Sequence, residues 1–225
     1  MARTRALITG FEPYGGRGLN PAAEVANRLD GEVLGGVDVV GRTFPVSYQS
    51  LRANVEQAID EVDPALVIAF GLWPGQPMIR LERVALNLAD FDIADNDGLL
   101  LSDQPLVAGG ATARLATLPL RAIERALLDA GIPVEVSNTA GTFLCNAVLY
   151  AALDVLEARG TAVPCGFIHL PYLPAQVAGL ITEGKESRAI ELQQRADIAS
   201  MALETMVAAA RIALDVALAE AEARS

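Results

Sequence analysis

The residues best suited to nucleophilic chemistry are Cys145 and His169, because the chain holds only two cysteines and one histidine. Cys145 follows a connection of small and polar residues, 137–142, and is expected in the first turn of the next helix. With Thr142 as N-cap, unpaired backbone N–H groups would lower the pKa of the thiol and could hold a developing oxyanion. A lone cysteine can equally be a small buried hydrophobe, and the sequence leaves both interpretations open.

His169 lies near the end of the apolar run 166–170, which is expected to be a strand. Sites in open α/β sheets gather beyond the carboxyl ends of strands, and histidine is the usual base that activates a cysteine. Because the chain has no other histidine, any cysteine–histidine mechanism must use this one. Glu82 could orient the imidazole, although a surface pair between Glu82 and Arg83 is the plainer interpretation.

Other kinds of site have weaker support. Cys165 begins the same apolar run and is expected in the core, and so few soft ligands predict no metal site. The glycine-rich loop 10–18 has Gly16-Arg17 where a phosphate-binding loop needs Lys followed by Ser or Thr. Its two aromatic residues, Phe11 and Tyr14, suit a flat uncharged ring better than a phosphate.

Composition excludes several classes of partner. The 225 residues carry 17 Lys and Arg against 28 Asp and Glu, a net charge of −11, so neither nucleic acid nor an anionic membrane is expected to bind. Two cysteines are too few for a secreted disulfide framework, and no apolar stretch is typical of a membrane span. We therefore expect a cytoplasmic protein.

The pattern of apolar residues predicts a single domain over residues 1–225 of the α/β class. Its strands are expected at 6–10, 37–46, 65–70, 79–93, 134–137 and 166–170. Its helices are expected at 22–29, 50–62, 118–130, 142–159 and 189–221, with 99–111 an irregular loop and 176–187 left open. This alternation predicts a three-layer α/β/α sandwich around a twisted mixed, partly parallel central sheet.

Several segments together resemble one family, the pyroglutamyl peptidase I or pyrrolidone-carboxylate peptidase family. The segments that carry the resemblance are Gly10–Gly16 with Asn20-Pro21, Glu82–Asn87 with Asp95-Asn96, Ala140–Asn146, Gly166–Pro174 and Ser200–Glu204. They follow one another along nearly the whole chain, which makes their agreement far more specific than any single motif.

The resemblance implies an enzyme that removes an N-terminal pyroglutamyl (5-oxoproline) residue from peptides, with a Glu–Cys–His triad and no cofactor. Carried over, Cys145 is the nucleophile, His169 the general base and acid, and Glu82 the residue that orients His169. The residues expected to wall the lactam pocket are Phe11, Tyr14, Ile93, Phe143 and Leu144. The resemblance also implies N-terminally pyroglutamylated peptides as substrates and a homo-oligomer, a tetramer.

The chain departs from the family pattern before the glutamate and in the loop after it. Trp73-Pro74-Gly75-Gln76 stands where the family commonly has Ala-Gly-Gly-Arg, and Asp92 where it often has arginine. A cation near the reacting carbonyl could stabilise negative charge, which Asp92 cannot do. Tyr14 replaces the usual phenylalanine. A catalytically weakened protein that binds pyroglutamate-like molecules is therefore the alternative function.

Overall fold

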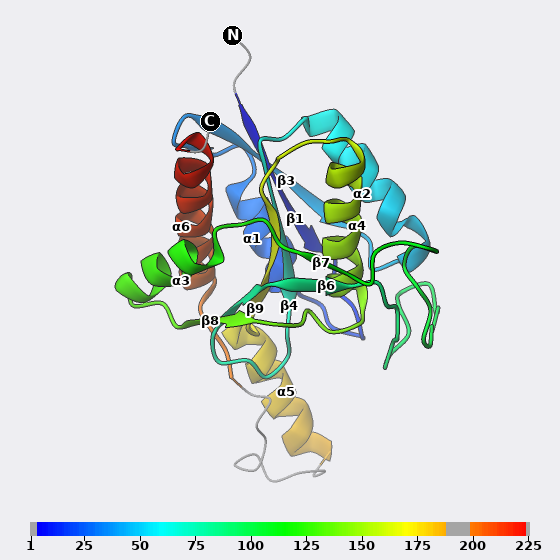
Figure 1. Cartoon of the computed structure of the whole chain (residues 1–225). Helices are drawn as coiled ribbons and strands as arrows, with labels where there is room; N and C mark the ends of the chain where they lie inside the picture. Colours follow the sequence, from blue (N-terminus) through cyan, green and yellow to red (C-terminus); the bar gives the residue numbers. More distant parts are fainter. Residues whose placement is uncertain (1–3, 188–198, 224–225) are drawn as a thin grey trace.

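The computed structural model describes residues 4–187 and 199–223, and a seven-stranded sheet with the strand order β2-β3-β1-β4-β9-β5-β8 forms its centre (Figure 1). Its strands are β1 (Arg5–Phe11), β2 (Val33–Leu34), β3 (Val37–Phe44), β4 (Leu66–Leu72), β5 (Ile79–Glu82), β8 (Val134–Ser137) and β9 (Cys165–Leu170). β2 runs antiparallel to β3 and β5 antiparallel to β9, while the other neighbours are parallel. The prediction of a mixed, partly parallel sheet is thus confirmed.

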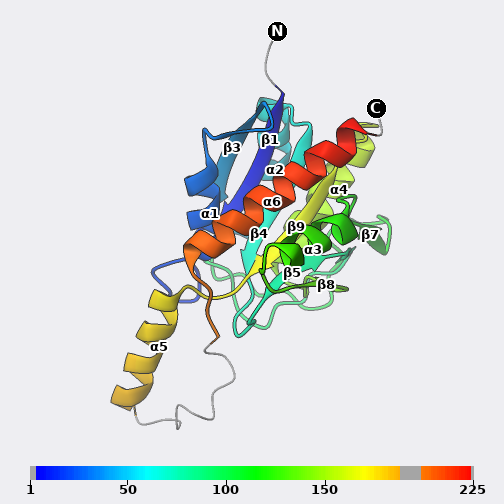
Figure 2. The same ribbon diagram turned by 90° about the vertical axis from the view of Figure 1, so that its left-hand side faces the viewer.

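Helices cover both faces of this sheet, as expected for three layers. Helices α1 (Pro21–Leu29), α3 (Leu120–Asp129) and α6 (Leu203–Glu222) pack on the face turned to the viewer in Figure 2. Helices α2 (Tyr48–Val62) and α4 (Leu144–Ala158) cover the opposite face. Helix α5 (Pro174–Ser187) extends away from the sheet at the end where β4 and β9 finish. Strand β6 (Val84–Leu86) pairs with β7 (Ala113–Leu115) next to α4.

The alternation of side chains along the central strands decides which residues meet α4. In β9, Cys165 and Phe167 belong to the core on the α2/α4 face, whereas Ile168 and Leu170 belong to the other core. Because successive strand residues point to opposite faces, His169 is on the α4 face. The same rule applies in β5, where Ile79 and Leu81 lie in the α1/α3/α6 core. Arg80 and Glu82 therefore also point toward the α4 face.

The predicted elements differ from the structure mainly at their ends. The strand expected over 79–93 is wrong beyond Leu86, because the Asn146 side chain takes the backbone N–H and C=O of Leu86 and the C=O of Leu88. The helix expected from 142 starts at Leu144, since the hydroxyl of Thr142 donates instead to the carbonyl of Asp90 at 2.5 Å.

Other differences concern short or terminal elements. Strands β2 and β7, of two and three residues, were not expected, because so few residues carry no measurable periodicity. Part of the helix expected over 189–221 lies outside the described residues, and α6 begins only at Leu203. None of the described helices has the length and apolar character that crossing a bilayer requires.

Gly10, near the end of β1, is packed against the backbone of α1, and its replacement tests that contact. A Cβ atom on Gly10 would lie 2.2 Å from the carbonyl oxygen of Ala22, which cannot move aside without moving the helix. We expect Gly10→Ala to lower the free energy of unfolding by about 3 kcal/mol, the upper range for overpacking. Gly18→Ala is the matched control, because nothing lies within 4 Å of its added Cβ. Equal losses for both variants in urea denaturation would contradict this packing.

Candidate active site

A buried hydrogen bond joins His169 and Glu82. The imidazole Nδ1 lies 2.8 Å from Oε1 of Glu82, and the two residues are 1% and 0% exposed. An ionised carboxylate only accepts hydrogen bonds, so Nδ1 carries the proton and donates it to Glu82. The other ring nitrogen, Nε2, is then left with a free lone pair that can accept a proton.

The surroundings of His169 keep its imidazole neutral at rest. Burial lowers the pKa of His169 below its ordinary value of 6.5, and this outweighs the hydrogen bond and charge of Glu82, which raise it. The positive charge of Arg80 lowers the pKa further. A neutral imidazole with one proton on Nδ1 is the form that acts as a general base.

Cys145 is brought to the same place by the start of α4. A Cβ atom on Gly71 would lie 2.8 Å from the Sγ of Cys145, so the sulfur packs directly on this glycine of β4. Gly71 is in turn the register partner of His169 in the parallel pair of β4 and β9. On the α4 face of the sheet, the sulfur of Cys145 thus lies over Gly71, which is the neighbour of His169 across the two strands.

The pKa of the Cys145 thiol is raised, contrary to the expectation of a lowered pKa, although the residue as a whole is only partly buried. Burial of the sulfur and the negative charge of Glu82 raise the pKa of Cys145 to about 12, while its own backbone N–H lowers it. Desolvation therefore outweighs the field of the helix N-terminus at this position. A protonated thiol in this environment needs a base beside it before it can act as a nucleophile.

Backbone and side-chain hydrogen bonds hold the connection that leads into α4. Ser137 Oγ donates to the carbonyl of Thr139 at 3.1 Å, and Thr139 Oγ1 accepts from the N–H of Gly141 at 3.1 Å. Gly141 has φ +77°, a left-handed conformation that favours glycine. At the far side of Cys145, the fully buried Asn146 donates to the carbonyls of Leu86 and Leu88. No role was expected for Asn146 from the sequence, although it follows Cys145 directly.

An aromatic cluster begins at Phe143, two residues before Cys145. The ring of Phe143 lies 6.1 Å from that of Tyr14 and 4.8 Å from that of Phe91, measured between centroids. Phe91 in turn meets Tyr48 edge-on at 5.7 Å. Burial raises the pKa of Tyr14 above its ordinary value of 10. Phe91 was not anticipated, because its segment was expected to be a strand.

The remaining expected pocket residues are placed differently from one another. Phe11 and Leu144 are 4% and 1% exposed and belong to the core on the α4 face, together with Phe91. Ile93 is 45% exposed in the loop after Phe91.

The loop after β1 is fastened by a carboxylate that sequence reasoning passed over. Oε1 of Glu12 accepts from the backbone N–H of Val46 at 3.1 Å and from Nδ2 of Asn96 at 2.8 Å. Asn20, whose side chain also caps α1, donates to the carbonyl of Glu12. The available signal for this role was a carboxylate placed between Phe11 and Pro13 in a loop rich in glycine.

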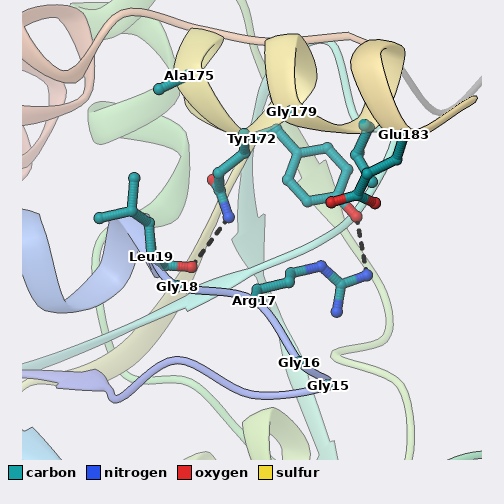
Figure 3. Close-up of a pocket in the computed structure, with 11 residues that line it drawn as sticks. Gly15, Gly16, Arg17, Gly18, Leu19, Tyr172, Ala175, Gly179 and Glu183 are labelled. Carbon is teal, nitrogen blue, oxygen red and sulfur yellow. Dashed lines mark hydrogen bonds between the residues drawn. The ribbon is translucent and has the colours of Figure 1, made fainter. Parts of the chain in front are cut away.

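A cavity of about 320 Å³ lies between this loop and α5 (Figure 3). Arg17 donates to the hydroxyl of Tyr172 at 3.1 Å and lies over the ring of Tyr14, 5.4 Å from its centroid. Gln176 also lines the cavity and donates to the carbonyl of Leu19 at 3.0 Å. Arg17, which lines the cavity, therefore connects it to the aromatic cluster through the ring of Tyr14.

The residues that depart from the family pattern occupy different environments. Asp92 is exposed in the loop beyond Phe91. The ring of Trp73 meets the imidazole of His169 edge-on, with 4.9 Å between centroids.

Cys165 is buried, and burial raises its pKa to about 12. Among the described residues, no group of three or more His, Cys, Asp or Glu could hold a metal ion.

Comparison with known proteins finds relatives that all belong to one peptidase family. The sequence model described as Pyroglutamyl peptidase matches residues 4–220. The chain is 38% identical over 216 residues to the pyrrolidone-carboxylate peptidase of Pyrococcus furiosus, covering 96% of this chain and 99% of that protein. It is 43% identical over 216 residues to pyrrolidone-carboxylate peptidase 2 of Photorhabdus laumondii, covering 96% and 92%.

Similarity extends to solved structures. The pyrrolidone carboxyl peptidase of Thermococcus litoralis superposes with a TM-score of 0.90 at 36% identity, over 99% of this chain and 96% of that one.

The single histidine makes the protonation state of His169 directly measurable. We expect its imidazole signal, followed by NMR on protein labelled with ¹³C-histidine, to titrate below the ordinary pKa of 6.5, because burial opposes the charged form. In Glu82→Gln the midpoint should move lower still, since the carboxylate that favours the imidazolium is gone. A wild-type midpoint at or above 6.5 would contradict the neutral resting imidazole.

Proposed function

Because the chain belongs to the pyroglutamyl peptidase family, we propose that Glu82, Cys145 and His169 form its catalytic triad. The chain is a pyroglutamyl-peptidase I, a cysteine peptidase that hydrolyses the amide bond after an N-terminal pyroglutamyl residue. One observation carries the assignment of roles: the chain's only histidine is hydrogen-bonded to a buried carboxylate, at the strand position next to the sulfur of Cys145.

The first step follows from the protonation states at rest. Nε2 of His169 takes the proton of the Cys145 thiol, and the sulfur attacks the carbonyl carbon of the scissile amide. Glu82 stabilises the imidazolium that forms and holds the ring through Nδ1. Because the thiol is otherwise protonated, transfer to His169 and attack on the substrate are coupled.

The second half of the reaction returns every group to its starting state. The backbone N–H of Cys145, at the start of α4, faces the negative oxygen of the tetrahedral intermediate. His169 gives its proton to the leaving amine, and the carbon–nitrogen bond breaks to leave a thioester. His169 then takes a proton from water as the water oxygen attacks the thioester carbon. The carbon–sulfur bond breaks, the imidazolium returns that proton to the departing sulfur, and pyroglutamic acid leaves.

Recognition of the lactam ring depends on the aromatic cluster. The pyrrolidone ring is flat and uncharged, so the rings of Tyr14 and Phe143 provide suitable walls, with Phe11 and Leu144 behind them. Phe91 supports Phe143 from the side, and we assign it to the same pocket together with the more exposed Ile93. An open glutamate would bring charges into this apolar site without partners and is therefore rejected.

Further properties follow from family membership. We propose that the chain acts as one catalytic domain over residues 1–225, without a cofactor, in the cytoplasm. The substrates are N-terminally pyroglutamylated peptides. We also propose that copies associate as a homo-oligomer, a tetramer, which light scattering measures directly.

The nucleophile assignment is tested by two matched cysteine variants. We expect Cys145→Ser to lose more than about 10³-fold in kcat on a chromogenic pyroglutamyl amide, because an alcohol is a far poorer nucleophile beside the same base. Cys165→Ser, which changes the other cysteine, keeps the catalytic groups and should remain active and sensitive to iodoacetamide. Full activity in Cys145→Ser with an unchanged thermal unfolding temperature would defeat the proposed function.

A further inference from the structure

Arg80 lies at the back of the active site without having been assigned any role. In the antiparallel pair of β5 and β9 it stands directly opposite His169, and both side chains point to the α4 face. Arg80 is only 9% exposed. A guanidinium this deeply buried needs polar partners to offset its desolvation, and its partners show what it does.

The guanidinium of Arg80 contacts three parts of the site at once. Nε lies 3.2 Å from Oε1 of Glu82, the same oxygen that accepts from His169. Nη2 donates to Oγ of Ser137 at 2.6 Å and to the carbonyl of Thr139 at 3.3 Å. These last two residues begin the connection that leads to Cys145, so one side chain spans the carboxylate and the nucleophile-bearing segment.

Glu82 needs a counter-ion in this position. Its carboxylate is fully buried, and Oε2 has no hydrogen-bond partner among the described residues. Among the described residues, Arg80 is the arginine that lies within ion-pair distance of the Glu82 carboxylate. The N–H of Nε does not point at the carboxylate, so this contact is an ion pair and not a hydrogen bond. A buried carboxylate left without such a charge would be strongly destabilised.

Trp73 links the same arginine to the imidazole. The guanidinium carbon of Arg80 lies 4.1 Å from the centroid of the indole ring, a cation–π contact. The same ring meets His169 edge-on at 4.9 Å, and it lies 3.7 Å from where a Cβ on Gly141 would be. Arg80 thus also holds the indole that packs between His169 and the connection to α4.

We infer that Arg80 is a positioning residue of the peptidase reaction, which pairs with Glu82 and fastens the 137–141 connection so that His169 and Cys145 stay aligned. This inference rests on the proposed triad and adds a charged fourth member behind it. The role has two parts. The positive charge of Arg80 acts on Glu82 and His169. The planar guanidinium group donates hydrogen bonds to Ser137 and Thr139, and its flat face stacks on the ring of Trp73.

The charged and titratable groups around His169 are few. Arg80 and Glu82 come from β5 and Cys145 from α4, while β4 contributes the uncharged Gly71 and Trp73 follows it. Glu135 of β8 faces Arg80 with 3.7 Å between its Oε1 and Nε, but its side chain is 47% exposed and solvated. Loss of the arginine charge therefore leaves the negative charge of Glu82 unopposed beside the imidazole.

Two variants separate the two parts of the role. In Arg80→Met, we expect the NMR midpoint of the single histidine, and the acid limb of kcat/KM with it, to rise by about one pH unit, because a like charge near His169 has gone. The kcat at the pH optimum should fall about tenfold from misalignment. In Arg80→Lys, the midpoint should stay near that of wild type while kcat still falls, since an ammonium cannot replace the planar fork.

Arg114 provides the matched control, because it also pairs with a carboxylate, Asp154, and lies over an aromatic ring, that of Tyr150. Arg114→Met should lower stability and leave both the histidine midpoint and the acid limb unchanged. The inference is overturned if Arg80→Met resembles Arg114→Met in these two readouts, or if Arg80→Lys has the kcat of wild type. If Arg80→Met does not fold, Arg80→Lys alone decides.

The histidine titration does not require turnover. If the wild-type protein did not cleave the pyroglutamyl amide, but Arg80→Met still raised the titration midpoint of His169, the Arg80–Glu82 pairing would be supported and the proposed triad refuted.

Discussion

The site depends on a single buried interaction, the hydrogen bond from Nδ1 of His169 to Glu82 in a region closed to water. Burial alone would favour a neutral imidazole in either tautomer, whereas the carboxylate fixes the proton on Nδ1. The free lone pair of Nε2 is then available to the one nucleophile beside it. Burial likewise raises the pKa of the Cys145 thiol, so in the proposed mechanism the sulfur gives its proton to His169 as it attacks the substrate.

The topology of the sheet makes this arrangement possible. Parallel pairing of β4 with β9 sets Gly71 beside His169, and the missing side chain of that glycine gives the sulfur of Cys145 room to approach. Strand β5 runs antiparallel to β9, which sets Arg80 opposite His169 and Glu82 opposite Phe167. Two neighbouring strands of opposite direction thus place His169, Glu82 and Arg80 on one face of the sheet, and α4 covers that face with Cys145.

Much of this could be predicted from residue types and order. The buried β4, the Asn20-capped α1 and the chemistry of the only histidine follow from local pattern, because each depends on neighbours within a few residues. The pKa of Cys145 could not be predicted, since it depends on how many atoms the folded chain packs around one sulfur. The contacts of Arg80 were equally hidden, because its partners at 82, 137 and 139 meet only through sheet pairing.

The most direct measurement is a crystal structure of the protein soaked with the aldehyde analogue of pyroglutamic acid, whose carbonyl carbon reacts reversibly with a nucleophilic thiolate. The account predicts a covalent bond from Sγ of Cys145 to that carbon, with the lactam ring between Tyr14 and Phe143. It also predicts that Nε2 of His169 faces the sulfur from which it took the proton. Aldehyde attached to another nucleophile, or an unmodified Cys145 with the ring bound elsewhere, would contradict it.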